Sequence, residues 1–191
     1  MSSALKMPPR MTVAEFLEWE PDDRSGARWQ LRDGETEMMA PASDPHGSIQ
    51  SELAYLITAH LRATGRSCRV VTAPGVVPEE RSEDNCLVLG ITCAPPTGAH
   101  LMHEPLVLIE ILSPTNISRT RANVRAYTTI PTVTEIVVLR STAIAAEVLR
   151  RAPNGEWPPQ PDIMDAAGEL RLDSIGFTVP LREAYRTTTL A

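Results

Sequence analysis

The chain has 191 residues, of which 42% are hydrophobic and 22% are charged, as expected for one soluble α/β domain that buries roughly 70% of its unfolded surface. The formal net charge of -6 gives no general attraction to phosphate, so nucleic-acid binding would need a local basic patch. No apolar run approaches the ~18–20 residues of a membrane span, and no apolar signal core opens the chain. We therefore expect a cytoplasmic protein with no membrane partner.

The three cysteines, Cys68, Cys86 and Cys93, are odd in number and lack a C-x-x-C spacing. This pattern argues against a disulfide framework and against a structural zinc site. We expect all three to be small buried hydrophobic residues.

Two strong local signals mark the first forty residues. Thr12-Val13-Ala14-Glu15 fits a capping box and predicts a short helix that begins at Thr12 and ends before Pro21. Residues 29–32 and 35–39 are alternating runs joined by Asp33-Gly34, which predicts a β-hairpin with a type I′ turn.

A long helix is predicted next. Asp44 suits the N-cap, and Pro45 suits the first helical position because its missing N–H costs nothing there. Gly65 is a typical C′ residue that ends a helix. Apolar residues recur at helical spacing and give one apolar face, which must lie on a sheet: Ile49, Leu53, Leu56, Ile57 and Leu61.

The middle of the chain predicts three strands. Residues 68–71 form a short strand, and a turn-rich charged connection leads to a nearly all-apolar strand over residues 86–93. Residues 105–112 are apolar, rich in β-branched side chains and stopped by Ser113-Pro114, which indicates a strand covered on both faces.

Glu110 breaks the apolar pattern of that third strand. An ionised carboxylate inside a sheet is unfavourable by several kcal/mol unless it is paired or holds a metal. The alternatives are a catalytic carboxylate and a carboxylate that reaches solvent or an arginine.

The last third of the chain predicts a helix, a hairpin and two short strands. The helix covers residues 118–128, the hairpin joins residues 134–140 and 143–150, and the final strands at 170–172 and 175–179 precede a helical turn containing Tyr185. No linker marks a second domain. We expect a disordered segment at residues 1–10 and a single domain over residues 11–191.

In this order and spacing, these elements and motifs resemble the Uma-two family, a branch of the PD-(D/E)XK nuclease superfamily. The motifs that carry the likeness are residues 11–17, 30–35, His46 opening the long helix, 110–114 and 126–131. The resemblance implies an α/β restriction-endonuclease-like core with a mixed central sheet flanked by helices. It also implies a metal-dependent endonuclease acting on DNA as a homodimer.

The resemblance further implies that an Asp on one strand and a Glu on the next hold Mg²⁺ or Mn²⁺, which polarises a phosphate and activates a water. Glu110 matches the family's Glu. Leu112 stands where the superfamily has Lys, and Asn123 stands where family members often carry Lys instead. Asn123 can orient a water but offers no positive charge. His46 would donate to phosphate or simply cap its helix.

The chain departs from the family at the partner Asp. Family members show a Pro-Asp step just before the residue matching Leu89, whereas here Val88 runs directly into Leu89. Asp84 lies four residues before Val88, about 13 Å along an extended strand, and could replace the lost ligand only if the strand slid or bulged. With Glu110 alone, Mg²⁺ would keep mostly water ligands and bind weakly.

Three arginines, Arg119, Arg121 and Arg125, lie on the second predicted helix and would meet a DNA backbone or form a solvated helix face. Our interpretation is a metal-dependent DNA endonuclease with an impaired metal site. The alternative is a non-catalytic nucleic-acid- or protein-binding module on the same fold.

Overall fold

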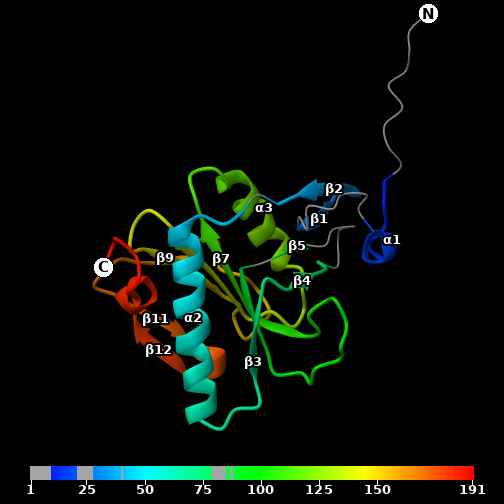
Figure 1. The fold of residues 1–191 in the computed structure, drawn as a ribbon. Coiled ribbons are helices and arrows are strands. Elements are labelled where there is room, and N and C mark those ends of the chain that lie inside the picture. Colours follow the sequence, from blue (N-terminus) through cyan, green and yellow to red (C-terminus); the bar gives the residue numbers. More distant parts are fainter. Residues whose placement is uncertain (1–9, 21–27, 40, 79–84, 87) are drawn as a thin grey trace, which may run out of the picture.

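A six-stranded mixed sheet forms the centre of the computed structural model, which describes residues 10–20, 28–39, 41–78, 85–86 and 88–191 (Figure 1). Neighbouring strands are antiparallel except for one parallel pair, β7 with β8. The order across the sheet is β10 (Asp162–Met164), β9 (Ala146–Arg150), β8 (Glu135–Arg140), β7 (Pro105–Leu112), β6 (Leu89–Thr92) and β3 (Arg69–Thr72). The predicted α/β fold with a mixed central sheet is confirmed.

Two helices cover opposite faces of this sheet, and β7 has buried side chains on both. Val107, Ile109 and Ile111 point to the face covered by α2 (Asp44–Ala63), the long helix that Figure 1 shows along the sheet. Leu108 points to the other face, where it packs with Val124 and Tyr127 of α3 (Ile117–Tyr127). The strand is therefore apolar on both sides, as its sequence predicts.

Helix ends follow the predicted signals with one difference. Helix α1 (Val13–Glu18) carries the capping box, in which the Glu15 amide donates to Thr12 Oγ1 and the Thr12 amide donates to Glu15. Helix α2 begins at Asp44 itself, and its N-cap is Ser43, so the prediction of Asp44 as the cap is wrong by one residue. Gly65 has φ +65°, the left-handed conformation of a C′ glycine.

The predicted hairpin is confirmed and lies outside the central sheet. Strands β1 (Trp29–Arg32) and β2 (Glu35–Met38) pair antiparallel, and Asp33 and Gly34 have φ of 47° and 81°. Positive φ at both central residues is what a type I′ turn requires. Two strands alone are marginal in water, so this hairpin depends on its contacts with the rest of the molecule.

The strand predicted over residues 86–93 is interrupted. Strand β5 (Asn85–Cys86) pairs with β4 (Gly75–Val76), whereas β6 begins only at Leu89. Between them, the Val88 carbonyl accepts from the Ala73 amide and from Gln50 Nε2 of α2. These bonds turn Val88 into the core on the α2 face, which explains why one apolar run gives two strands.

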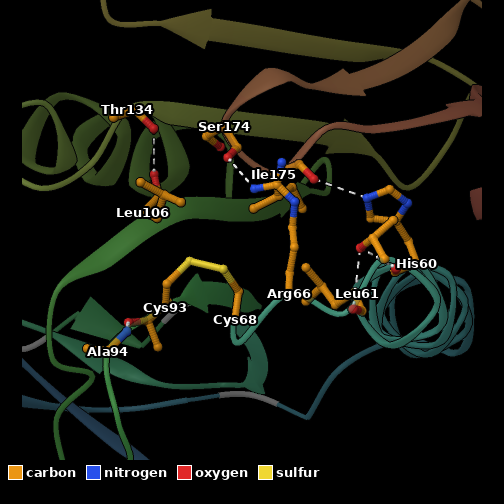
Figure 2. The surroundings of a disulfide bond; sticks show 12 residues. His60, Leu61, Arg66, Cys68, Cys93, Ala94, Leu106, Thr134, Ser174 and Ile175 are labelled. Carbon is orange, nitrogen blue, oxygen red and sulfur yellow. Dashed lines mark hydrogen bonds between the residues drawn. A yellow bond between two sulfur atoms is a disulfide. The ribbon is translucent and has the colours of Figure 1, made fainter.

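The cysteine prediction is wrong for two of the three residues, because Cys68 and Cys93 form a disulfide (Figure 2). Strands β3 and β6 pair with Arg69 opposite Thr92, which places the flanking Cys68 and Cys93 opposite each other. A separation of 25 residues in the chain gives no sign of this pairing, which depends on the strand register. Cys93 is exposed rather than buried.

The C-terminal segment completes the core on the α2 face. It comprises β11 (Glu169–Leu172), the 3₁₀ turn η1 (Asp173–Ile175), β12 (Phe177–Pro180) and the 3₁₀ helix η2 (Leu181–Tyr185). Buried side chains from all four pack with α2 and the sheet: Leu170, Leu172, Ile175, Phe177, Leu181 and Tyr185. The predicted final strand begins at Phe177 rather than Ile175, because Ile175 ends the turn before Gly176 at φ +63°.

Three further sequence predictions concern the N-terminal segment, the number of domains and membrane-spanning helices. The predicted disordered segment falls, apart from Arg10, on residues outside the described part of the chain. The single domain over residues 11–191 stays a prediction. Among the described residues, none of the helices combines the length and apolar character that crossing a bilayer requires.

Candidate functional site

Glu110 is a buried acid on the α3 face of the sheet. It follows Leu108 by two residues on β7, so strand alternation points it toward α3, and only 5% of its surface remains exposed. The strand around it supplies apolar side chains alone. Any polar partner of this carboxyl must therefore come from the layer above the sheet.

Helix α3 supplies two neutral donors to this carboxyl. Asn123 Nδ2 donates to Glu110 Oε1 over 3.0 Å, and the Tyr127 hydroxyl donates to the same oxygen over 2.7 Å. Asn123 and Tyr127 are four residues apart, so one face of the helix presents both side chains to β7. The predicted association of Glu110 with Asn123 is therefore a direct contact.

Burial raises the pKa of the Glu110 carboxyl above its ordinary value. The hydrogen bonds from Asn123 and Tyr127 and the positive charge of Arg119 favour the ionised form, but desolvation is the larger effect. A carboxyl in this environment differs from a structural ion pair, in which a cationic partner holds the carboxylate ionised.

A second layer of polar contacts joins α3 to the β1–β2 hairpin. Arg32 of β1 donates from Nη2 to Asn123 Oδ1 over 3.4 Å, and its Nε lies 3.6 Å from Glu37 Oε2. Glu37 of β2 accepts from Arg119 of α3 and from Gln30 Nε2, the latter over 2.8 Å. The network thus runs from buried Glu110 through Asn123 to a half-exposed cluster on the hairpin.

The described residues do not fit a firmly held Mg²⁺ ion. Strand β6 lies beside β7 with Leu89 opposite Ile109 and Gly90 opposite Leu108, so it brings no carboxylate to Glu110. Nowhere in the described part of the chain do three His, Cys, Asp or Glu residues gather as metal ligands. Mg²⁺ normally takes one or two carboxylates in addition to substrate phosphate. Asp84, the predicted substitute ligand, lies outside the described residues.

His46 does not join this network. It lies in the first turn of α2, which packs on the opposite face of the sheet from α3, and among the described residues no hydrogen bond or ion pair links it to Glu110. The side chain is half-buried, and burial lowers the pKa of its imidazole, which favours the neutral form. Its predicted role stays a prediction.

The three arginines predicted to contact DNA have separate surroundings. Arg119 pairs with Glu37, and Arg121 holds Glu147 of β9 through both terminal nitrogens, one of them at 2.7 Å. Arg125 is exposed and forms no ion pair with the described residues. These side chains therefore do not form one continuous basic row.

Four residues of the network were not assigned to the site by the sequence prediction: Gln30, Arg32, Glu37 and Tyr127. Tyr127 was recognisable as a helix-face residue four positions after Asn123, but the pattern indicated an apolar contact. Arg32 and Glu37 flank a correctly predicted turn. Their approach to α3 depends on how the hairpin packs, and local sequence carries no signal for that.

The comparisons with known proteins agree with this architecture. Residues 13–181 match the family model Uma2, described as "Putative restriction endonuclease". A crystal structure of a "putative nuclease belonging to DUF820" from Anabaena variabilis ATCC 29413 superposes with a TM-score of 0.71 at 15% sequence identity, over 92% of this chain and 98% of that one. At this identity the likeness shows the fold alone. No curated protein matches the chain.

Proposed function

This chain belongs to the Uma2 family, whose model is described as "Putative restriction endonuclease", and from that premise we propose that it binds DNA and that its Mg²⁺-dependent phosphodiester cleavage is weak or lost. The single observation behind this proposal is the environment of Glu110. Its carboxyl is buried, accepts bonds from two neutral donors and belongs to no group of three potential metal ligands among the described residues. That environment is what we expect of a chain that keeps the family's fold but has lost an efficient metal centre.

Two features support the loss of an efficient centre. Val88, which directly precedes the position where the family's Asp is missing, is turned into the apolar core. Arg119 lies close enough to lower the pKa of Glu110 by its charge, so a divalent cation bound there would be repelled. Mg²⁺ or Mn²⁺ held by Glu110 alone would keep mostly water ligands and dissociate readily.

The proposal also includes roles for Asn123, His46 and a homodimer. Asn123 would orient groups at Glu110 rather than supply charge, because its amide already bonds both Glu110 and Arg32. His46 would act only as a neutral donor or acceptor. A homodimer would present two sites to the two DNA strands, in keeping with the family's description as restriction endonucleases.

The alternative is a non-catalytic module that binds nucleic acid or protein. The hydrogen-bond network from Glu110 to the hairpin favours it, because Glu110, Asn123, Arg32, Gln30 and Glu37 bond mostly to one another rather than to an open metal position. The two candidates differ in one observable property, which is cleavage in any divalent metal.

A cleavage assay tests the proposal. Purified protein is incubated with duplex DNA in Mg²⁺ and in Mn²⁺, beside the variants Glu110→Ala and Asp84→Ala, and binding is measured by gel shift in EDTA. We expect a gel shift and slow or undetectable cleavage. Robust cleavage that Glu110→Ala abolishes and Asp84→Ala leaves intact would contradict the impaired centre, and absence of any gel shift would contradict DNA binding.

A further inference from the structure

Two guanidinium groups from separate elements converge on one carboxylate at the edge of the site. Arg32 comes from β1 and Arg119 from α3, and both contact Glu37 of β2. All three side chains are accessible to solvent, with exposed fractions of 31%, 36% and 35%. Two arginines held at fixed positions around an anionic group match the geometry of phosphate recognition.

An external anion can replace Glu37 as the partner of Arg119. The other arginine pair of α3, between Arg121 and Glu147, cannot be replaced in this way. The Glu147 side chain that Arg121 holds is only 7% exposed, so no external anion can take its place. Around Glu37, by contrast, water and salt screen the pair, and exposed ion pairs contribute little to stability. An incoming anion can therefore exchange with the Glu37 carboxylate at small cost.

One donor of the cluster has no hydrogen-bond acceptor. Arg32 Nε is buried, and it is unbonded within the described part of the chain, since Glu37 Oε2 at 3.6 Å is beyond hydrogen-bond distance. Such a donor is costly to leave unsatisfied. A phosphate offers more oxygens over a wider tetrahedral span than a carboxylate and can satisfy it.

An open pocket gives access to this cluster. It has a volume of about 410 Å³ and is lined by Arg10, Arg32, Asp33, Glu35, Thr36 and Glu37. Arg10 adds a third cation to the mouth. The acidic side chains Asp33 and Glu35 oppose an anion there, so the site must draw its selectivity from the two arginines.

We propose that Arg32 and Arg119 form a binding site for a backbone phosphate of nucleic acid, and that Glu37 occupies this site in the free protein as an internal competitor. The inference rests on the proposed function in taking nucleic acid as the ligand. A phosphate bound there would sit at the hairpin edge of the network that leads through Asn123 to Glu110. The acidic side chain would then weaken binding in the native protein rather than assist it.

The test compares Glu37→Gln with the matched variant Glu35→Gln. Both remove one negative charge from strand β2 and from the same pocket, but Glu35 is exposed and, although it lies opposite Arg32 in the hairpin, forms no ion pair with an arginine among the described residues. Fluorescence anisotropy with a short labelled DNA duplex, in EDTA and over a series of NaCl concentrations, gives both the affinity and its salt dependence. A third variant, Glu37→Gln with Arg119→Gln, removes the competitor and one of the two cations.

We expect Glu37→Gln to bind about tenfold more tightly than Glu35→Gln, with a salt slope steeper by about 0.9, the value for one additional phosphate contact. Adding Arg119→Gln should reverse both changes, while thermal unfolding shows that each variant remains folded. Binding by Glu37→Gln alone, with none by the native protein, also supports the internal competitor.

Equal affinities and equal slopes for Glu37→Gln and Glu35→Gln would overturn the inference. If the native protein binds DNA in that case, the proposed function survives and only the phosphate site is wrong. If the native protein and all variants fail to bind at the lowest salt, both the site and the proposed function fail.

Discussion

Two carboxyls on the α3 face of the sheet lie in one row and have opposite environments. Val138 of β8 stands opposite Glu110 of β7 on one side and opposite Glu147 of β9 on the other. Both acids are buried, at 5% and 6% exposure, and both are contacted by α3. Within the described part of the chain, Glu147 receives Arg121 and Arg140, whereas Glu110 receives hydrogen bonds only from the neutral Asn123 and Tyr127.

The difference separates a structural acid from a candidate functional one. Hydrogen bonds from Arg121 are the largest cause of a lowered pKa at Glu147, so this carboxylate stays ionised and ties α3 to β9. At Glu110 desolvation dominates and the pKa is raised. A group that the fold holds at a cost to stability is a candidate for function, because residues selected for packing alone avoid such a cost.

The comparison predicts its largest effect for Glu147→Ala. Removal of the carboxylate leaves Arg121 and Arg140 without their buried partner and detaches α3 from β9, so we expect a loss of about 2 kcal/mol in the free energy of unfolding. Urea denaturation measures it, with Glu169→Ala on an exposed position as the control. Equal stability of the two variants would contradict the structural role.

Acidification should reduce the contribution of Glu147 to the free energy of unfolding, because a protonated carboxyl no longer forms ion pairs with Arg121 and Arg140. Its folded-state pKa lies below the unfolded value of 4.5, so its stabilisation is present above pH 4.5 and is lost as the pH falls through the folded pKa. Glu147→Gln should therefore differ from the native protein by about 1 kcal/mol at neutral pH, and the difference should shrink in acid. Urea unfolding across that pH range checks this. A constant difference would exclude the ion pair as its source.

Glu110→Gln should have the smallest effect and the opposite sign. Because the folded-state pKa of Glu110 is raised, its contribution is fully present below pH 4.5 and is lost as the pH rises through the folded pKa. Glutamine accepts from Asn123 and Tyr127 without a charge to desolvate, so we expect a gain of up to about 1 kcal/mol at neutral pH and no gain in acid. The same urea series measures it. A loss at neutral pH would mean that Glu110 is a structural acid like Glu147.

Local sequence signals were sufficient for much of the fold. The capping box at Thr12, the Asp33-Gly34 turn and the apolar run around Glu110 each act over a few residues, and the structure confirms all three. The interruption at Val88 and the disulfide between Cys68 and Cys93 depend on distant hydrogen bonds and strand register, which a local pattern does not contain.

The sequence pointed to Glu110 and Asn123 at the centre of the candidate site, but not to the contact of Glu37 with Arg119 at its edge. The buried position of Glu110 followed from its place in an apolar run that predicts a strand covered on both faces, and the family resemblance placed Asn123 near it. Glu37 and Arg119 lie 82 residues apart in the chain, and their contact depends on a hairpin docking against a helix. Charge patterns along the sequence suggested instead that Arg119 belongs to a row with Arg121 and Arg125.

The strands of the central sheet follow one another across it in the order in which they occur along the chain, from β3 to β10. Each new strand can pair with the strand that precedes it in the sheet, so no pairing has to wait for a later part of the chain. The core on the α2 face is different, because residues from β11 to η2, far from α2 in the chain, complete it. During synthesis the part of the α2 surface that this segment covers therefore stays exposed until residues 169–185 are available, and exposed apolar surface favours aggregation in that interval.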